Sequence, residues 1–129
     1  MLFKSKTNFL GFLYVGLLLL GSVVPIGNQA SNILMDNYTL DIRWDYLLHA
    51  LIYLPLPLIL FYGRRSIAGS GAIRLIFLSV FIPVLFEILQ MAIPYRSFNI
   101  NDMIANCFGV VLGWVLVVAL RKGRLYPHK

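Results

Sequence analysis

Long apolar runs alternate with short polar segments along the chain. Four runs cover approximately residues 8–27, 44–62, 72–93 and 103–120. Each is close to the roughly 20 helical residues that cross a hydrocarbon core of about 30 Å. The polar segments between them are too short to form a separate soluble domain. The pattern therefore predicts an all-α membrane protein with a single domain over residues 1–129, a compact bundle of four transmembrane helices.

The first run also has a feature of a signal peptide, because Lys4 and Lys6 precede it. It is longer than the usual apolar region of such a peptide, and residues 28–30 make a poor cleavage site. We therefore expect the first run to stay in the protein as a membrane helix.

Charged residues divide the connecting segments into two kinds. The segments before run one, between runs two and three, and after run four contain basic residues and no acidic ones. The alternate segments contain four aspartates against two arginines. The basic residues are Lys4, Lys6, Arg64, Arg65, Arg74, Arg121, Lys122, Arg124 and Lys129. Basic flanks mark the cytoplasmic side, so both termini are predicted to be cytoplasmic in a multi-pass membrane protein.

Composition supports this interpretation and limits the alternatives. Hydrophobic residues make up 60% of the chain and charged residues 12%, whereas soluble domains have about 25% charged residues. The net charge of +6 comes from the short cytoplasmic flanks, so no nucleic-acid partner is expected. The single Cys107 excludes an internal disulfide and is expected to be a packing residue. With His128 in the tail and only His49 in a run, no metal or other cofactor is predicted.

Polar residues occur in the predicted outer halves of three runs. In the second run, Asp45, His49 and Tyr53 are four residues apart and share one helix face. In the third run, Glu87 lies about 9 Å below the outer end by helical rise, and Gln90 shares its face. An ionised carboxylate in hydrocarbon is costly, so Glu87 is expected to face the interior of the bundle.

The fourth run carries a further stripe on one helix face. Asp102 and Asn106 begin it, and Gly109 and Gly113 continue it toward the inside. The two glycines, four residues apart, predict a seam at which a neighbouring helix can approach closely. We expect the polar groups of the three runs to meet in one outward-facing cavity.

Prolines interrupt the second and third runs. Pro55, Pro57 and Pro83 each remove a helical hydrogen bond and predict bends. Two interpretations are open: ordinary helix irregularity, or bends that move the outer halves apart and open a cleft.

The polar motifs resemble those of the VanZ-like membrane proteins over roughly residues 43–115. The resemblance implies a small integral membrane protein of the bacterial cell envelope, in a family whose name-giving member is associated with low-level teicoplanin resistance. Tyr46 stands where the family often has lysine, and Asn99 and Asn101 stand where acidic residues are frequent. The matching motifs are Asp45-x-x-x-His49-x-x-x-Tyr53, Glu87-x-x-Gln90, Arg96-Ser97-Phe98 and Asp102-x-x-x-Asn106-x-x-Gly109.

The first functional hypothesis is that these residues bind or process the head group of an envelope lipid. Arg96 would hold a lipid phosphate, and free N–H groups from Ser97 to Asp102 would add an anion-favourable helix terminus. Catalytic residues are unknown, with His49 and Glu87 as candidates for proton transfer. The proposed binding residues are Asp45, His49, Tyr53, Glu87, Gln90, Arg96, Ser97, Asp102 and Asn106.

Other hypotheses stay open. In an accessory or structural envelope protein, with or without a protein partner, Arg96 would pair with Asp102, and His49 with Glu87, to hold the bundle together. A proton or ion pathway is disfavoured, because the inner halves of the runs lack ionisable groups. An intramembrane metal hydrolase would need more ligands than His49 offers. No established catalytic motif decides whether the protein is an enzyme.

Overall fold

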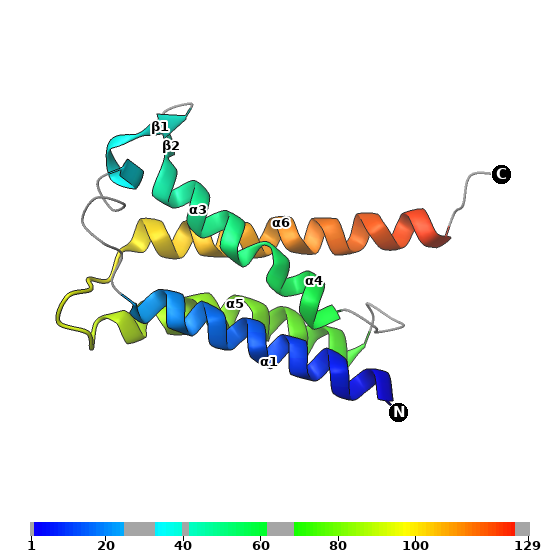
Figure 1. Cartoon of the computed structure of the whole chain (residues 1–129). Helices are drawn as coiled ribbons and strands as arrows, with labels where there is room; N and C mark the ends of the chain where they lie inside the picture. Colours follow the sequence, from blue (N-terminus) through cyan, green and yellow to red (C-terminus); the bar gives the residue numbers. More distant parts are fainter. Residues whose placement is uncertain (1, 25–32, 40–41, 62–68, 126–129) are drawn as a thin grey trace.

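The computed structural model describes residues 2–24, 33–39, 42–61 and 69–125, and within these ranges it is an all-α bundle (Figure 1). A pair of two-residue antiparallel strands precedes the second long apolar segment. The elements are α1 (Leu2–Val23), β1 (Tyr38–Thr39), β2 (Ile42–Arg43), α3 (Trp44–Tyr53), α4 (Pro55–Phe61), α5 (Ser70–Gln90) and α6 (Ile100–Leu125). The predicted fold class is confirmed.

Three of the described helical segments are long and apolar enough to cross a membrane, namely Trp44–Phe61, Ser70–Gln90 and Ile100–Lys122. The described apolar part of α1, Phe9–Val23, is shorter, and residues 25–27 of the expected first span lie outside the described residues. The start of α1 and the end of α6 lie at one end of the bundle, and the α5–α6 connection lies at the other (Figure 1). We call the end with the α5–α6 connection the outer end, following the predicted orientation.

The second span is a broken helix. Helix α3 ends at Tyr53, and α4 starts at Pro55 after the single residue Leu54. Proline has no N–H to donate to the helical hydrogen-bond ladder, so the break lies at the proline-containing segment where the sequence predicts a bend. The Tyr14 hydroxyl of α1 donates to the Ile52 carbonyl beside the break. A neighbouring helix thus bonds the backbone next to the break; the carbonyls that lose their helical donors are those of Leu51 and Tyr53, four residues before Pro55 and Pro57.

Helix α5 continues through Pro83 as one element. Pro83 cannot donate to the Ser79 carbonyl one turn earlier. The fully buried Ser79 hydroxyl donates to the Ile76 carbonyl (2.8 Å) and accepts from Trp114 Nε1 (2.9 Å). A polar contact near the middle of the bundle therefore joins α5 to α6.

The two glycines of α6 lie directly against the broken helix. A Cβ added to Gly109 would lie 2.1 Å from the Ala50 carbonyl oxygen, and one added to Gly113 would lie 2.3 Å from that of Leu54. These are backbone contacts that only glycine allows, which confirms the predicted close approach. They also show that α3 and α6 touch in their outer halves. Of the two open interpretations of the prolines, the one in which bends move the outer halves apart is therefore contradicted for α3 and α6.

Apolar packing fills the centre and the inner half. The central cluster lies where α1, the broken helix, α5 and α6 meet; its buried members are Leu18, Tyr53, Leu56, Ile82, Phe86 and Val110. The inner cluster contains Phe61, Ala72, Leu75 and Val117. The Trp114 ring meets Phe61 edge-on at 5.0 Å, and the Arg121 guanidinium lies 5.0 Å from the centre of the same Phe61 ring.

Candidate functional site

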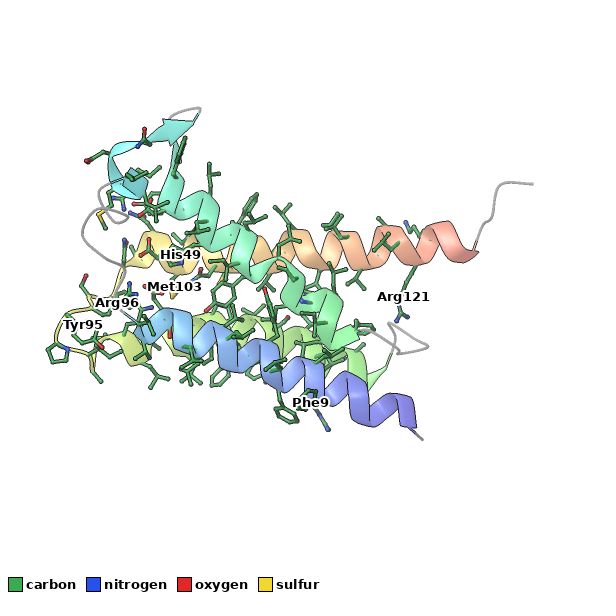
Figure 2. The ribbon with its side chains drawn as sticks, viewed as in Figure 1. Phe9, His49, Tyr95, Arg96, Met103 and Arg121 are labelled. Atoms are coloured by element: carbon green, nitrogen blue, oxygen red, sulfur yellow. The ribbon has the colours of Figure 1, made fainter. Side chains whose placement is uncertain are left out.

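Buried polar side chains gather at the outer end of the bundle. Among the described residues, the buried polar or charged side chains are Asp45, Ser79, Glu87, Gln90 and Asn106. All except Ser79 were predicted as site residues. Figure 2 shows His49 and Arg96 at the outer end, with Arg121 at the opposite end. We call the following set the outer polar cluster: Arg43, Asp45, His49, Glu87, Gln90, Arg96, Asn99, Asp102 and Asn106.

The imidazole of His49 lies between two residues of α6. His49 Nδ1 donates to Asn106 Oδ1 at 2.9 Å, and His49 Nε2 lies 3.7 Å from Asp102 Oδ2. Asp102 and Asn106 are one helical turn apart, so they present neighbouring groups to the same ring. The predicted stripe on α6 therefore meets the predicted stripe on α3, and the Asn106 side chain is almost fully buried, at 2% exposure.

The two ring nitrogens of His49 therefore face different groups. Nδ1 bonds the Asn106 amide oxygen, and Nε2 faces the Asp102 carboxylate. Imidazole and carboxylate groups are the usual acid–base groups of proteins, so this contact is where acid–base chemistry of the outer polar cluster would be centred.

Glu87 binds the backbone at the start of α6. Its side chain is 1% exposed, and Oε1 accepts a hydrogen bond from the Asn99 backbone N–H at 3.3 Å. The first N–H groups of a helix have no partner within the helix. Glu87 therefore faces the protein interior, as the sequence predicts. It contacts a helix terminus there, and Asn106 rather than Glu87 is the partner of His49.

Asn99 itself caps helix α6. Its Oδ1 accepts from the Asn101 backbone N–H at 3.0 Å, and its carbonyl accepts the first helical bond from Met103 at 3.1 Å. Asn is among the preferred N-cap residues. With Asp102 in the first turn, this terminus already has acidic and polar partners. The expectation of free N–H groups between Ser97 and Asp102 is therefore wrong at Asn99 and Asn101.

Arg96 binds the last turn of α1. Its Nη2 donates to the Val24 carbonyl at 2.6 Å and lies 3.5 Å from the Gly21 carbonyl. The last carbonyls of a helix lack helical partners, and a basic side chain there satisfies them and complements the helix dipole. Arg96 thus fastens the α5–α6 connection to α1. The alternative hypothesis, in which Arg96 pairs with Asp102 to hold the bundle together, is therefore wrong about the partner of Arg96.

Asp45 pairs with a residue that the sequence analysis did not select. Arg43 Nε donates to Asp45 Oδ1 at 3.0 Å, Arg43 Nη2 bonds Oδ2, and the Tyr46 backbone N–H donates to Oδ1 at 2.9 Å. The hydrogen bond to Asp45 raises the pKa of Arg43 above its usual range. Arg43 also lies over the Tyr46 ring, 4.5 Å from its centre. Arg43 and Asp45 therefore bind each other within one turn at the start of α3.

Several polar atoms of the cluster have no partner in the described part of the chain. Asp102 Oδ1 and Arg96 Nε are buried and make no hydrogen bond there. The Gln90 side chain, 7% exposed, also makes none with the described residues. Buried polar groups are rarely left unpaired because the cost is about 1–3 kcal/mol each. These atoms are where water or a ligand would find partners.

Two predicted site residues lie apart from these contacts. Tyr53 is buried in the central apolar cluster beside Phe86 and Val110. Ser97 is exposed in the α5–α6 connection. Within the described ranges, no group of three or more His, Cys, Asp or Glu side chains could hold a metal ion.

The structure adds residues that the sequence analysis did not assign to the site. Asn99 had a visible signal, because Asn followed at the third helical position by Asp102 is a typical helix start. Arg43 had none beyond its closeness to Asp45. The Asn101 side chain donates to the Tyr46 hydroxyl at 3.3 Å. Two positions that depart from the VanZ-like pattern therefore contact each other.

Comparison with known proteins gives the family. The family model described as VanZ/LLP1 matches residues 4–121, nearly the whole chain. The chain therefore belongs to the VanZ/LLP1 family, and the match and the apolar helices together make it a VanZ-like membrane protein. No curated protein matches the chain, and no solved structure does.

Proposed function

We propose that the outer polar cluster binds the head group of a bacterial envelope lipid on the outward-facing side of α3, α5 and α6. The observation that carries this proposal is the buried, unpartnered Asp102 Oδ1 near the start of α6, with the buried Gln90 side chain at the end of α5 as a second polar group. Gln90 is the last residue of α5 and Asp102 the third of α6. By helical rise both lie within about 5 Å of a helix end, at the level of lipid head groups.

His49 is the candidate acid–base group if the bound lipid is also processed. Its Nε2 lies 3.7 Å from Asp102 Oδ2, and imidazole is the side chain most often used for general acid–base catalysis. Glu87 is a weaker candidate than the sequence suggests, because one of its oxygens is used by the Asn99 N–H. Binding is thus the supported part of the proposal, and catalysis is its extension.

Native mass spectrometry of the protein released from detergent tests the binding. We expect wild type to retain a lipid adduct that Asp102→Asn loses, because the substitution removes the open charged acceptor and changes the shape little. Asp36→Asn is the matched control, since Asp36 is exposed and lies outside the outer polar cluster. Adducts that are equal in all three proteins would refute lipid binding at this site.

A purely structural or accessory role is the second candidate function. It is favoured by Glu87 on the Asn99 N–H and by Arg96 on the α1 carbonyls, since both contacts complete helix ends. In that case Asp102→Asn would change stability and leave the lipid adducts unchanged. The same preparations therefore distinguish the two candidates when melting curves are measured beside the mass spectra.

The proposed location is the bacterial inner membrane, with the outer polar cluster facing outward and both chain ends cytoplasmic. The charge distribution of the connecting segments supports this orientation. In a Cys107→Ser background, Asn37→Cys should react with an impermeant thiol reagent added to intact spheroplasts, and Ser70→Cys should not. Both positions are exposed. Reaction at position 70 alone would reverse the orientation.

A further inference from the structure

Both arginines described at the outer end bind partners within the protein, although Arg96 Nε stays unpaired. Arg43 makes two hydrogen bonds to Asp45, and Arg96 donates to the Val24 carbonyl of α1. An arginine recognises a phosphate by aligning its planar fork of donors with the phosphate oxygens. Neither guanidinium presents such a fork without first leaving its present partner. The described contacts thus provide little for an anion.

The charges of the outer polar cluster centre on Asp102. Three carboxylates, those of Asp45, Glu87 and Asp102, face two guanidinium groups and the His49 imidazole. Glu87 and Asp102 are close enough to repel each other electrostatically. Asp102 Oδ1 accepts no hydrogen bond from the described residues, and the amide of the buried Gln90 has an oxygen that can accept as well as two N–H donors. A cation here would relieve repulsion, whereas an anion would increase it.

We infer, on the basis of the proposed lipid-binding function, that the recognised part of the head group is a primary ammonium held by Asp102, with the Gln90 amide oxygen as a further acceptor. An ammonium carries three donors and no acceptor, which matches acceptors that lack donors. Its charge also makes the hydrogen bond to a carboxylate about twice as strong as a neutral one. The lipid phosphate then lies farther out, in the head-group layer.

The Asp102 carboxylate can be reached from outside. Its side chain is 18% exposed and lies in the first turn of α6. Oδ1 itself is buried, but rotation about the last torsion of an aspartate is soft and nearly two-fold, so either oxygen can turn outward. The other oxygen, Oδ2, lies 3.7 Å from His49 Nε2.

Lipids that differ in one group test the inference. Wild type in detergent is titrated with phosphatidylethanolamine and, in parallel, with phosphatidylethanol of the same acyl chains, which lacks the amine. Phosphatidylglycerol, whose head group has hydroxyl groups and no amine, is the third lipid in the comparison. The readouts are native mass spectra and the lipid-induced shift of the melting temperature. We expect phosphatidylethanolamine to bind about tenfold more tightly than either amine-free lipid, the size of one charge-assisted hydrogen bond.

Variants assign the preference to the site. Asp102→Asn and Gln90→Met should each reduce the preference for the amine, and Asp36→Asn should keep it. Gln90→Met preserves the side-chain volume and all carboxylates, so it reports on recognition even if Asp102→Asn unfolds. Water-soluble glycerophosphoethanolamine, added to wild type, distinguishes a free amine from a lipid-borne one. We expect the soluble compound to produce no shift at concentrations at which the lipid does.

The outcomes separate this inference from the proposed function. Equal binding of all three lipids, lost in Asp102→Asn, would refute ammonium recognition and leave head-group binding in place. Tighter binding of phosphatidylglycerol would do the same. Binding that is insensitive to both Asp102→Asn and Gln90→Met would refute the site itself, and with it the proposed function.

Discussion

The outer and inner halves of the bundle are held together by different means. In the inner half, apolar side chains such as Phe61, Leu75 and Val117 pack among the helices. In the outer half, Glu87 and Arg96 bind the backbone at helix ends. Lipid tails are as apolar as leucine, so apolar contacts alone give little preference for one helix arrangement. A polar side chain that binds a helix end can do so in few other helix arrangements. We therefore infer that these contacts fix the geometry of the outer half.

Within the outer half, some polar groups have hydrogen-bond partners in the protein and others have none in the described chain. Glu87, Arg96 and Asp45 each bind a partner within the protein, although Arg96 Nε stays unpaired. Asp102 has a weaker contact to His49 and one oxygen without a partner in the described chain. The outer half thus contains a structural part and a part available for binding. The predictions below begin with the glycine seam between α3 and α6 and then test the structural contacts of the outer half.

The largest effect is expected at the glycine seam. Gly109→Ala places a Cβ 2.1 Å from the Ala50 carbonyl oxygen, with two further Ala50 backbone atoms within 3 Å. The Ala50 backbone cannot move away from the added Cβ as a flexible side chain could, so α3 and α6 must separate. We expect the free energy of unfolding to fall by about 3 kcal/mol. Unfolding in mixed detergent micelles with increasing dodecyl sulfate measures it.

Gly16→Ala is the control for this change. Nothing lies within 4 Å of the added Cβ at Gly16, so the stability should be unchanged or slightly higher, because alanine is the better helix former. Equal losses at positions 16 and 109 would show that the seam contributes nothing specific.

The second effect concerns Glu87. Glu87→Ala leaves the Asn99 N–H without its acceptor, and we expect a loss of about 2 kcal/mol. Glu87→Gln keeps an oxygen in the same place and should lose less than half as much. The same titration measures both variants. If the glutamine variant is as unstable as the alanine variant, the charge rather than the contact with Asn99 matters.

Much of the fold and part of the site could be predicted from the sequence. Apolar run length located the helices, and the spacing of polar residues identified Glu87, Gln90 and Asn106, which are all buried. Composition and spacing report on side chains. The partners of Glu87 and Arg96 are backbone groups, which every residue carries, so no sequence pattern indicates them. The contact between Arg96 and the end of α1 also joins residues 72 positions apart.

The third effect concerns Arg96. Arg96→Gln removes the charged donor from the Val24 carbonyl, and we expect a loss of about 1 kcal/mol without lipid. The response to added phosphatidylethanolamine should stay. Arg74→Gln is the matched control, because Arg74 is exposed near the start of α5, and it should change little. An Arg96→Gln protein with normal stability and no lipid response would restore Arg96 as the phosphate anchor.

The smallest effect is expected at Tyr46, where the outer half meets solvent. The hydrogen bond from the Asn101 side chain to the Tyr46 hydroxyl is 3.3 Å long and exposed, so water can replace it. Tyr46→Phe should therefore cost no more than about 0.5 kcal/mol. It keeps the ring beneath the Arg43 guanidinium, 4.5 Å from its centre, whereas Tyr46→Leu removes both contacts and should cost about 1 kcal/mol. The difference between the two variants in the same titration isolates the contribution of the ring. If Tyr46→Phe alone lost 2 kcal/mol, the Tyr46 hydroxyl would belong to the structural part of the outer half. The structural contacts would then include an exposed hydrogen bond at the surface.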